Sequence, residues 1–195
     1  PDENSLESLF QSKGSKGAAA TILKDGNVYM SGGYSMDTNS IVQTASVFNM
    51  KNISRKDVTN LPKKLYDHIA AFLDDRTETG KVIVGLGTTE DETLNSSLWI
   101  FDPESDSYTP LNLDNQPMTK AKSITVDGEV YIVGGCTGTG ASNAVYKISA
   151  KTGSIVTESF ATLHSARCNH ALADVSTVDG SGNKTVKILV IGGVS

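Results

Sequence analysis

Short apolar runs that end in glycine recur along this chain at intervals close to fifty residues. The first is Val28-Tyr29-Met30-Ser31-Gly32-Gly33, and the third, Val130 to Gly135, is nearly identical to it. A weaker copy ends at Gly87, and another ends at Gly193. Self-similarity at a period near 50 residues is typical of repeat architectures, so each copy is expected to mark the same strand of a repeated unit.

The residues around each copy predict a unit of four short strands. In the first unit Asp25-Gly26 is a strong signal for a two-residue hairpin turn, because glycine accepts the positive φ that such turns need. Turn residues and short apolar runs of strand length then place the strands of this unit at residues 18–23, 28–31, 45–49 and 54–59.

The glycine-ended strands are apolar at consecutive positions and do not alternate with polar residues. A strand of this kind must be covered on both faces of its sheet, and a ring of stacked small sheets provides that cover. The sequence therefore predicts an all-β propeller with about three and a half four-stranded blades. A polar segment (1–16) precedes blades at 17–66, 67–118 and 119–166 and an incomplete blade at 167–195.

These units resemble kelch repeats. The matching features in the first unit are Asp25-Gly26, Val28-Tyr29, Gly32-Gly33, Val47-Phe48-Asn49 and Leu61-Pro62, and the third unit matches through residues 127–135 and Val145-Tyr146. The chain departs from the pattern at Leu86, where a glycine is expected, and at Trp99, because the family's tryptophan belongs to the fourth strand. The resemblance implies a kelch-type β-propeller, similar also to the central domain of galactose oxidase.

For function, the resemblance implies a module that binds protein or peptide partners, without catalysis and without a cofactor. The alternative is part of a secreted propeller enzyme, either a copper oxidase like galactose oxidase or a carbohydrate enzyme like the kelch-type sialic acid epimerase. Copper ligands in such an oxidase would be drawn from Tyr66, His68, Cys168 and His170, although Asp67 separates the tyrosine from the histidine. An adaptor role is favoured over an enzyme.

Three and a half blades do not close a ring. We expect the rest of the propeller to come from a longer chain of which this is a fragment, or alternatively from a second copy. Leu6 to Phe10, inside the polar segment, is compatible with a helical turn or with the outer strand of a preceding unit.

Strand direction predicts which loops share a face of the propeller. The loops after the glycines and the loops that lead into each blade should emerge together, and such loops commonly carry binding residues on a rigid scaffold. The candidates on this face are Tyr34, Asp37, Lys63, Lys64, Tyr66, Glu90, Asp91, Lys120, Lys122 and Arg167. They suggest an acidic rim with basic anchors inside it, suited to a peptide or a carboxylate ligand.

Histidine occurs at the same place in two units, at the start of the first strand. His68 and His170 hold this place, and Ala19 and Ala121 hold it in the other units. Such recurrence usually serves the fold, so no metal site is assigned, and the two histidines remain only weak metal candidates. Cys136 and Cys168 lie on neighbouring units at the same face, which makes a disulfide between blades geometrically reasonable.

Net charge and composition limit the kinds of partner and the compartments that can be expected. A net charge of −5 and a pI near 5.1 argue against a nucleic-acid binder that needs a basic footprint. No apolar run approaches 18 residues, so membrane insertion is not expected. Three glycan-acceptor triplets, at Asn52, Asn95 and Asn183, are weak support for secretion, and the compartment stays open between the cytoplasm and the secretory route.

Overall fold

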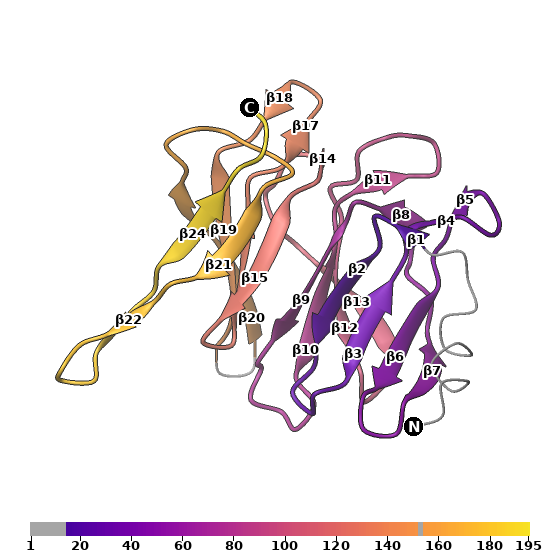
Figure 1. The fold of residues 1–195 in the computed structure, drawn as a ribbon, viewed down its shortest axis with the longest axis horizontal. Coiled ribbons are helices and arrows are strands. Elements are labelled where there is room, and N and C mark those ends of the chain that lie inside the picture. The colour runs from indigo at the N-terminus through magenta and orange to yellow at the C-terminus, as the bar shows by residue number, and fades with distance from the viewer. Residues whose placement is uncertain (1–14, 152–153) are drawn as a thin grey trace.

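In a computed structural model, described for residues 15–151 and 154–195, the chain is a fan of antiparallel sheets packed face to face (Figure 1). Three sheets have four strands each, and a fourth sheet has two. The first sheet has the order β2-β3-β6-β7, with strands Ala19–Ile22, Val28–Ser31, Ala45–Asn49 and Ser54–Val58. Each strand pairs with the one before it in the sheet, so every sheet is a simple meander, as the turn signals predict.

The next sheets repeat this order. Blade 2 contains β9 (Ile69–Leu73), β10 (Lys81–Gly85), β12 (Leu98–Asp102) and β13 (Ser107–Leu111), and blade 3 contains β15 (Lys122–Val126), β16 (Glu129–Val133), β19 (Ala144–Lys151) and β20 (Ser154–Thr162). Blade 4 has β21 (Ala171–Asp174) and β24 (Ile188–Ile191), with the hairpin β22–β23 (Thr177–Val178, Lys184–Thr185) between them. The predicted all-β fold of about three and a half blades is confirmed.

A second set of very short strands lies at the upper end of the blades in Figure 1. Here the segment leading into a blade pairs with the segment that follows the glycines of the same blade. The strands are β1 (Ser15–Lys16), β4 (Tyr34–Ser35) and β5 (Ser40–Ile41) in blade 1, β8 (Leu65–Tyr66) and β11 (Thr88–Thr89) in blade 2, and β14 (Met118–Thr119), β17 (Cys136–Thr137) and β18 (Gly140–Ala141) in blade 3. The two predicted loop sets therefore share one face.

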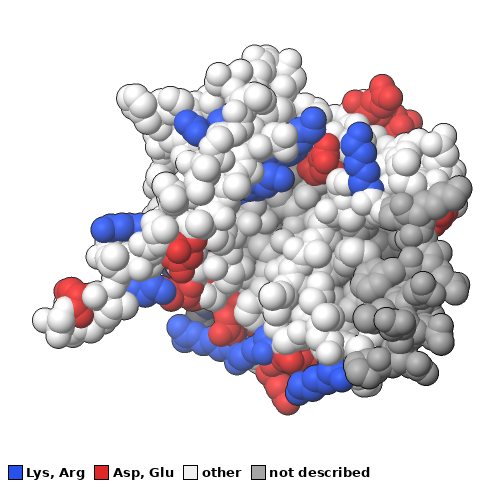
Figure 2. All heavy atoms as spheres, in the orientation of Figure 1, with Lys and Arg blue, Asp and Glu red and all other residues white. Residues whose placement is uncertain are grey.

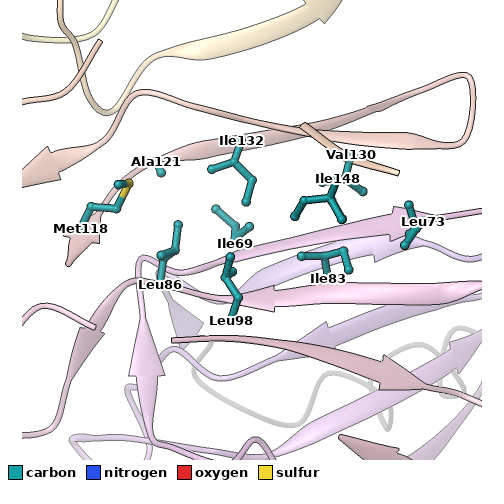
Figure 3. Close-up of a cluster of buried hydrophobic side chains, with 11 residues drawn as sticks. Ile69, Leu73, Ile83, Leu86, Leu98, Met118, Ala121, Val130, Ile132 and Ile148 are labelled. Atoms are coloured by element: carbon teal, nitrogen blue, oxygen red, sulfur yellow. The ribbon is translucent and has the colours of Figure 1, made fainter. Parts of the chain in front are cut away.

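The core lies between neighbouring sheets. Figure 3 shows the cluster between blades 2 and 3, where Ile83 and Leu98 of one sheet meet Ile132 and Ile148 of the next. A similar cluster between blades 1 and 2 centres on Tyr29, whose hydroxyl lies 2.8 Å from that of Tyr108. Burial on both sheet faces accounts for the uninterrupted apolar runs of the second strands.

Hairpins at the opposite end also connect the blades. Lys24 Nζ of blade 1 lies 3.3 Å from Asp74 Oδ1 of blade 2, and the Asp74 amide donates to the Gly128 carbonyl of blade 3. Lys184 of blade 4 forms an ion pair with Asp127 of blade 3. The hairpin end of the fan is thus connected from blade to blade, which favours a rigid scaffold.

Some expectations fall outside these observations. The segment from Leu6 to Phe10 lies outside the described residues. The division of the chain into blades at fixed residue boundaries remains a prediction. Within residues 15–151 and 154–195 there is no helix that could span a membrane.

Candidate functional site

One residue at the start of each blade has a left-handed backbone, and these four residues form a hydrogen-bonded row across the blades. Gly17, Asp67, Lys120 and Asn169 have φ values of 65°, 51°, 53° and 55°. The Asp67 amide donates to the Gly17 carbonyl, the Lys120 amide to Asp67, and the Asn169 amide to Lys120, over 2.8 to 3.1 Å. We call these four residues the axial row. Because backbone atoms make the bonds, the side chains are left to vary.

The second glycine of each pair ties its blade to the next one. The amides of Gly33, Gly87 and Gly135 donate to the carbonyls of Leu65, Met118 and Arg167, at 2.7, 2.8 and 3.0 Å. A Cβ atom on Gly33 would lie 3.0 Å from the Ala18 side chain, and one on Gly87 would lie 2.7 Å from Cβ of His68. The glycines therefore persist because the backbone passes too close for any side chain.

A side-chain link joins the same positions of successive blades. Between blades 2 and 3 it is a hydroxyl hydrogen bond of 3.0 Å from Thr88 to Thr119. Between blades 3 and 4 the corresponding residues are Cys136 and Cys168, which form a disulfide with their Cα atoms 5.2 Å apart. The disulfide thus strengthens a contact that already belongs to the repeat.

Several predicted binding residues are engaged within the chain. Lys64 forms an ion pair of 2.8 Å with Glu90, and Lys63 donates to Oδ1 of Asn95 over 3.3 Å. Tyr34 donates its hydroxyl proton to Asn39 over 2.6 Å. Tyr66 is half-buried in β8, while Asp37 and Asp91 are exposed in the segments after the glycines. All of these residues lie on the predicted face.

Asn95 lies at the base of this face. Its side-chain amide donates to the carbonyls of Leu86 and Ser97, at 3.2 and 3.0 Å, and the residue is 3% exposed. A buried asparagine with an occupied amide cannot accept a glycan in the folded protein. One of the three acceptor triplets therefore gives no support to secretion.

Three basic residues gather where blades 3 and 4 meet. Lys120, Lys122 and Arg167 form no ion pair with any residue of the described ranges. Figure 2 shows basic side chains near β14 and the upper end of β15; Lys122 begins β15, and Lys120 lies between the two strands. Asp67 is the neighbouring acid in the axial row, but its Oδ1 lies against Gly17. The basic character of this corner is thus left without an internal counter-charge.

The two repeated histidines are buried between blades. His68 is 7% exposed, and its Nε2 lies 3.1 Å from the Ser31 hydroxyl of the preceding blade. Burial lowers the pKa of His68 to about 4, so the ring is neutral near pH 7. His170 is 3% exposed, and among the described residues neither of its ring nitrogens has a partner with hydrogen-bond geometry.

The prediction that Ala19 matches the histidines is wrong by one residue. Ala18 is the equivalent, because it follows Gly17 of the axial row and contacts Gly33 as His68 contacts Gly87. The error arose because a run of three alanines gives no register of its own.

The first glycine of each pair makes room for the histidine of the next blade. A Cβ atom on Gly32 would lie 2.7 Å from Cε1 of His68, and one on Gly134 would lie 2.9 Å from Cε1 of His170. Between blades 2 and 3 the first glycine is Leu86 and the histidine is Ala121, both fully buried in one cluster (Figure 3). At this junction a large residue, Leu86, therefore replaces the small glycine, and a small residue, Ala121, replaces the large histidine. We call this the matched exchange.

A copper site built from the residues named above has no support in the geometry. Within the described ranges, no three histidine, cysteine or acidic side chains are grouped to hold a metal ion. Cys168 is bonded to Cys136, and His68 and His170 lie on either side of a complete blade.

Comparisons with known proteins agree with this geometry. The sequence profile described as "Kelch motif" matches residues 119–154, which begin in β14 and extend through β19. A solved structure titled "Structure of YjhT" is similar with a TM-score of 0.65 and 14% identity. The match covers 86% of this chain but only 60% of that one. The segment 119–154 is thus similar to a kelch motif, and the described residues share the fold of a β-propeller. No curated protein sequence matches it.

The axial row is the part of the predicted face that was not predicted as a unit. Lys120 was a candidate, but Asp67 and Asn169 were not. The signal that could have found them is their position, because each stands directly before the histidine or alanine that starts its blade. Glycine at this place in one repeat, with asparagine or aspartate in others, is typical of a left-handed residue.

Proposed function

We propose that this kelch segment is a module that binds protein or peptide partners through the face formed by the lead-in and post-glycine segments. The observation that carries the proposal is the construction of that face. Its short sheets order the segments within each blade, and the axial row and the disulfide join successive blades, so the face is one preorganised surface, which lowers the entropic cost of binding.

The charges of the face favour a polar or acidic partner segment. Glu90 and Asp91 lie on the exposed β11 side, whereas Lys120 and Arg167 lie at the axial row or next to it without internal counter-ions. A segment that brings an acidic group toward the row and polar groups toward the rim would match this pattern. The opposite face offers mainly hairpins whose charges are already paired, such as Lys24 with Asp74.

A displayed library of random peptides selected on the immobilised protein tests the proposal. We expect enrichment of a peptide family containing Asp or Glu, and loss of binding when Lys120 is changed to Ala. Lys56→Ala, on the exposed strand β7 away from the face, is the matched control and should bind as the wild type does. Selection of no peptide, or equal binding to both variants, would remove the proposal.

A further inference from the structure

Lys122 is a cation at a position that is otherwise apolar in the repeat. It pairs with Val133 at the end of the second strand, where Ala19 pairs with Ser31 and Ile69 pairs with Gly85. Ala19 and Ile69 are buried, and Lys122 is half-buried on the side of blade 3 that faces blade 4. Among the described residues its ammonium group forms no hydrogen bond or ion pair. An ammonium group on a half-buried side chain without an internal partner would be stabilised by an anion.

Arg167 adds a second positive charge at the same junction. Its guanidinium donates from Nη1 to the Gly192 carbonyl over 3.0 Å and from Nε to the Ser165 carbonyl over 3.4 Å. These bonds hold the side chain in place but leave its charge unneutralised within the described ranges. A half-buried guanidinium with donors to spare is suited to an oxyanion.

His170 completes the group, and among the described residues its ring nitrogens have no side-chain hydrogen-bond partner. In blade 2 the equivalent histidine bonds to the Ser31 hydroxyl, but the residue corresponding to Ser31 in blade 3 is Val133, which has none. Burial lowers the pKa of His170, and the charges of Lys122 and then Arg167 lower this pKa further. The Val133 backbone partly offsets the decrease in pKa. The geometry brings the three residues to one place: a Cβ atom on Gly134 would lie 2.9 Å from Cε1 of His170 and still closer to the Arg167 carbonyl oxygen, and Lys122 pairs with Val133, the residue before Gly134.

We propose that Lys122, Arg167 and His170 form a binding site for a carboxylate at the junction of blades 3 and 4. The inference deepens the proposed function, because it names the chemical group by which a partner would be anchored. The carboxylate comes either from an acidic side chain or from the C-terminus of the partner. The disulfide beside Arg167 fixes the distance between the two blades that supply the site.

Titration with acetate, followed by NMR of the histidine ring nitrogens, tests the site without any partner. Chloride at equal ionic strength is the baseline, and His170→Gln assigns the resonance. Because a bound anion offsets the two cations, acetate should raise the pKa of His170. Lys122→Met should weaken acetate binding about tenfold or more, as expected for loss of one charge-assisted contact. Lys56→Met, on the exposed strand β7, should leave it unchanged.

Failure of acetate to move His170, or an equal shift in Lys122→Met, would overturn the site. The Arg167→Lys variant controls for misfolding. Because it keeps the positive charge, it should still bind acetate, but more weakly than the wild type. Selected peptides with amidated C-termini then distinguish a side-chain carboxylate from a terminal one. If peptides bind while acetate does not, the carboxylate site fails and the binding module stands. If acetate binds while no peptide does, the carboxylate site stands and the proposed binding module fails.

Discussion

Changing Leu86 to Gly and Ala121 to His together should rebuild, between blades 2 and 3, the pair that the neighbouring junctions carry. In those junctions a glycine at this place leaves space for the histidine ring, with Cε1 2.7 and 2.9 Å from where a Cβ atom would lie. Leu86 fills the space instead, at 1% exposure and with a φ of 58°. The matched-exchange account requires that the two substitutions compensate each other.

The expected magnitudes follow from burial and backbone geometry. Removing a fully buried leucine side chain costs about 2–5 kcal/mol, and glycine at a left-handed position recovers about 1 kcal/mol. Leu86→Gly alone should therefore destabilise the fold by roughly 1–4 kcal/mol. Ala121→His alone should cost about 1–3 kcal/mol, because the ring crowds Leu86 in a close-packed cluster. With both changes the ring fills the space, so the coupling energy should be about 2 kcal/mol.

Urea denaturation of the wild type, both single variants and the double variant measures this coupling, with Trp99 fluorescence and circular dichroism as independent probes. Leu86→Gly combined with Leu73→Ala is the control, because Leu73 lies at the far end of the same cluster from Leu86 (Figure 3) and should not couple to it. A double variant as unstable as the two single losses together would refute the matched exchange.

Three further outcomes are expected. Reduction of the disulfide between Cys136 and Cys168, which spans 32 positions, should lower the free energy of unfolding by roughly 3–4 kcal/mol, measured by denaturation with and without reductant; an unchanged midpoint would contradict this. The neutral state of His68 stabilises the fold above its unfolded pKa of 6.5, and this stability should be lost as pH falls from 6.5 toward 4. His68→Gln should flatten that part of the pH–stability curve, and an equally steep curve would argue against it. Asn95→Ala should cost about 2 kcal/mol, because two buried carbonyls lose their donor; a loss below 0.5 kcal/mol would show that water replaces it.

The strands and their repetition could be predicted because they depend on local signals. Apolar runs, the Asp-Gly turn and the glycine pair give the four strands of blade 1 to within one residue, and strand direction gives the shared face. Cys136 and Cys168 could be paired because they lie on neighbouring repeats, in segments that emerge at the same face. These features follow from backbone turns and burial, which the residues themselves encode.

The site itself depends on contacts between blades, and these were only partly visible. The backbone bonds of the axial row leave no requirement on side-chain type except tolerance of a left-handed φ, which Lys120 meets without any sequence signal. Lys122 was a candidate, but its position between blades depends on register. The missing partner of His170 depends on Val133, which is distant in sequence and has no motif.

Hydrogen exchange of the protein with and without a selected peptide tests the central claim, that partners bind on the face of the axial row. The account predicts slowed exchange in the post-glycine segments (34–43, 88–97 and 136–143) and in the residues around Lys120 and Asn169. The hairpins at the other end, at residues 24–27, 74–80 and 176–185, should exchange at the same rate in both samples. Protection confined to those hairpins, or no protection on the axial-row face, would contradict it.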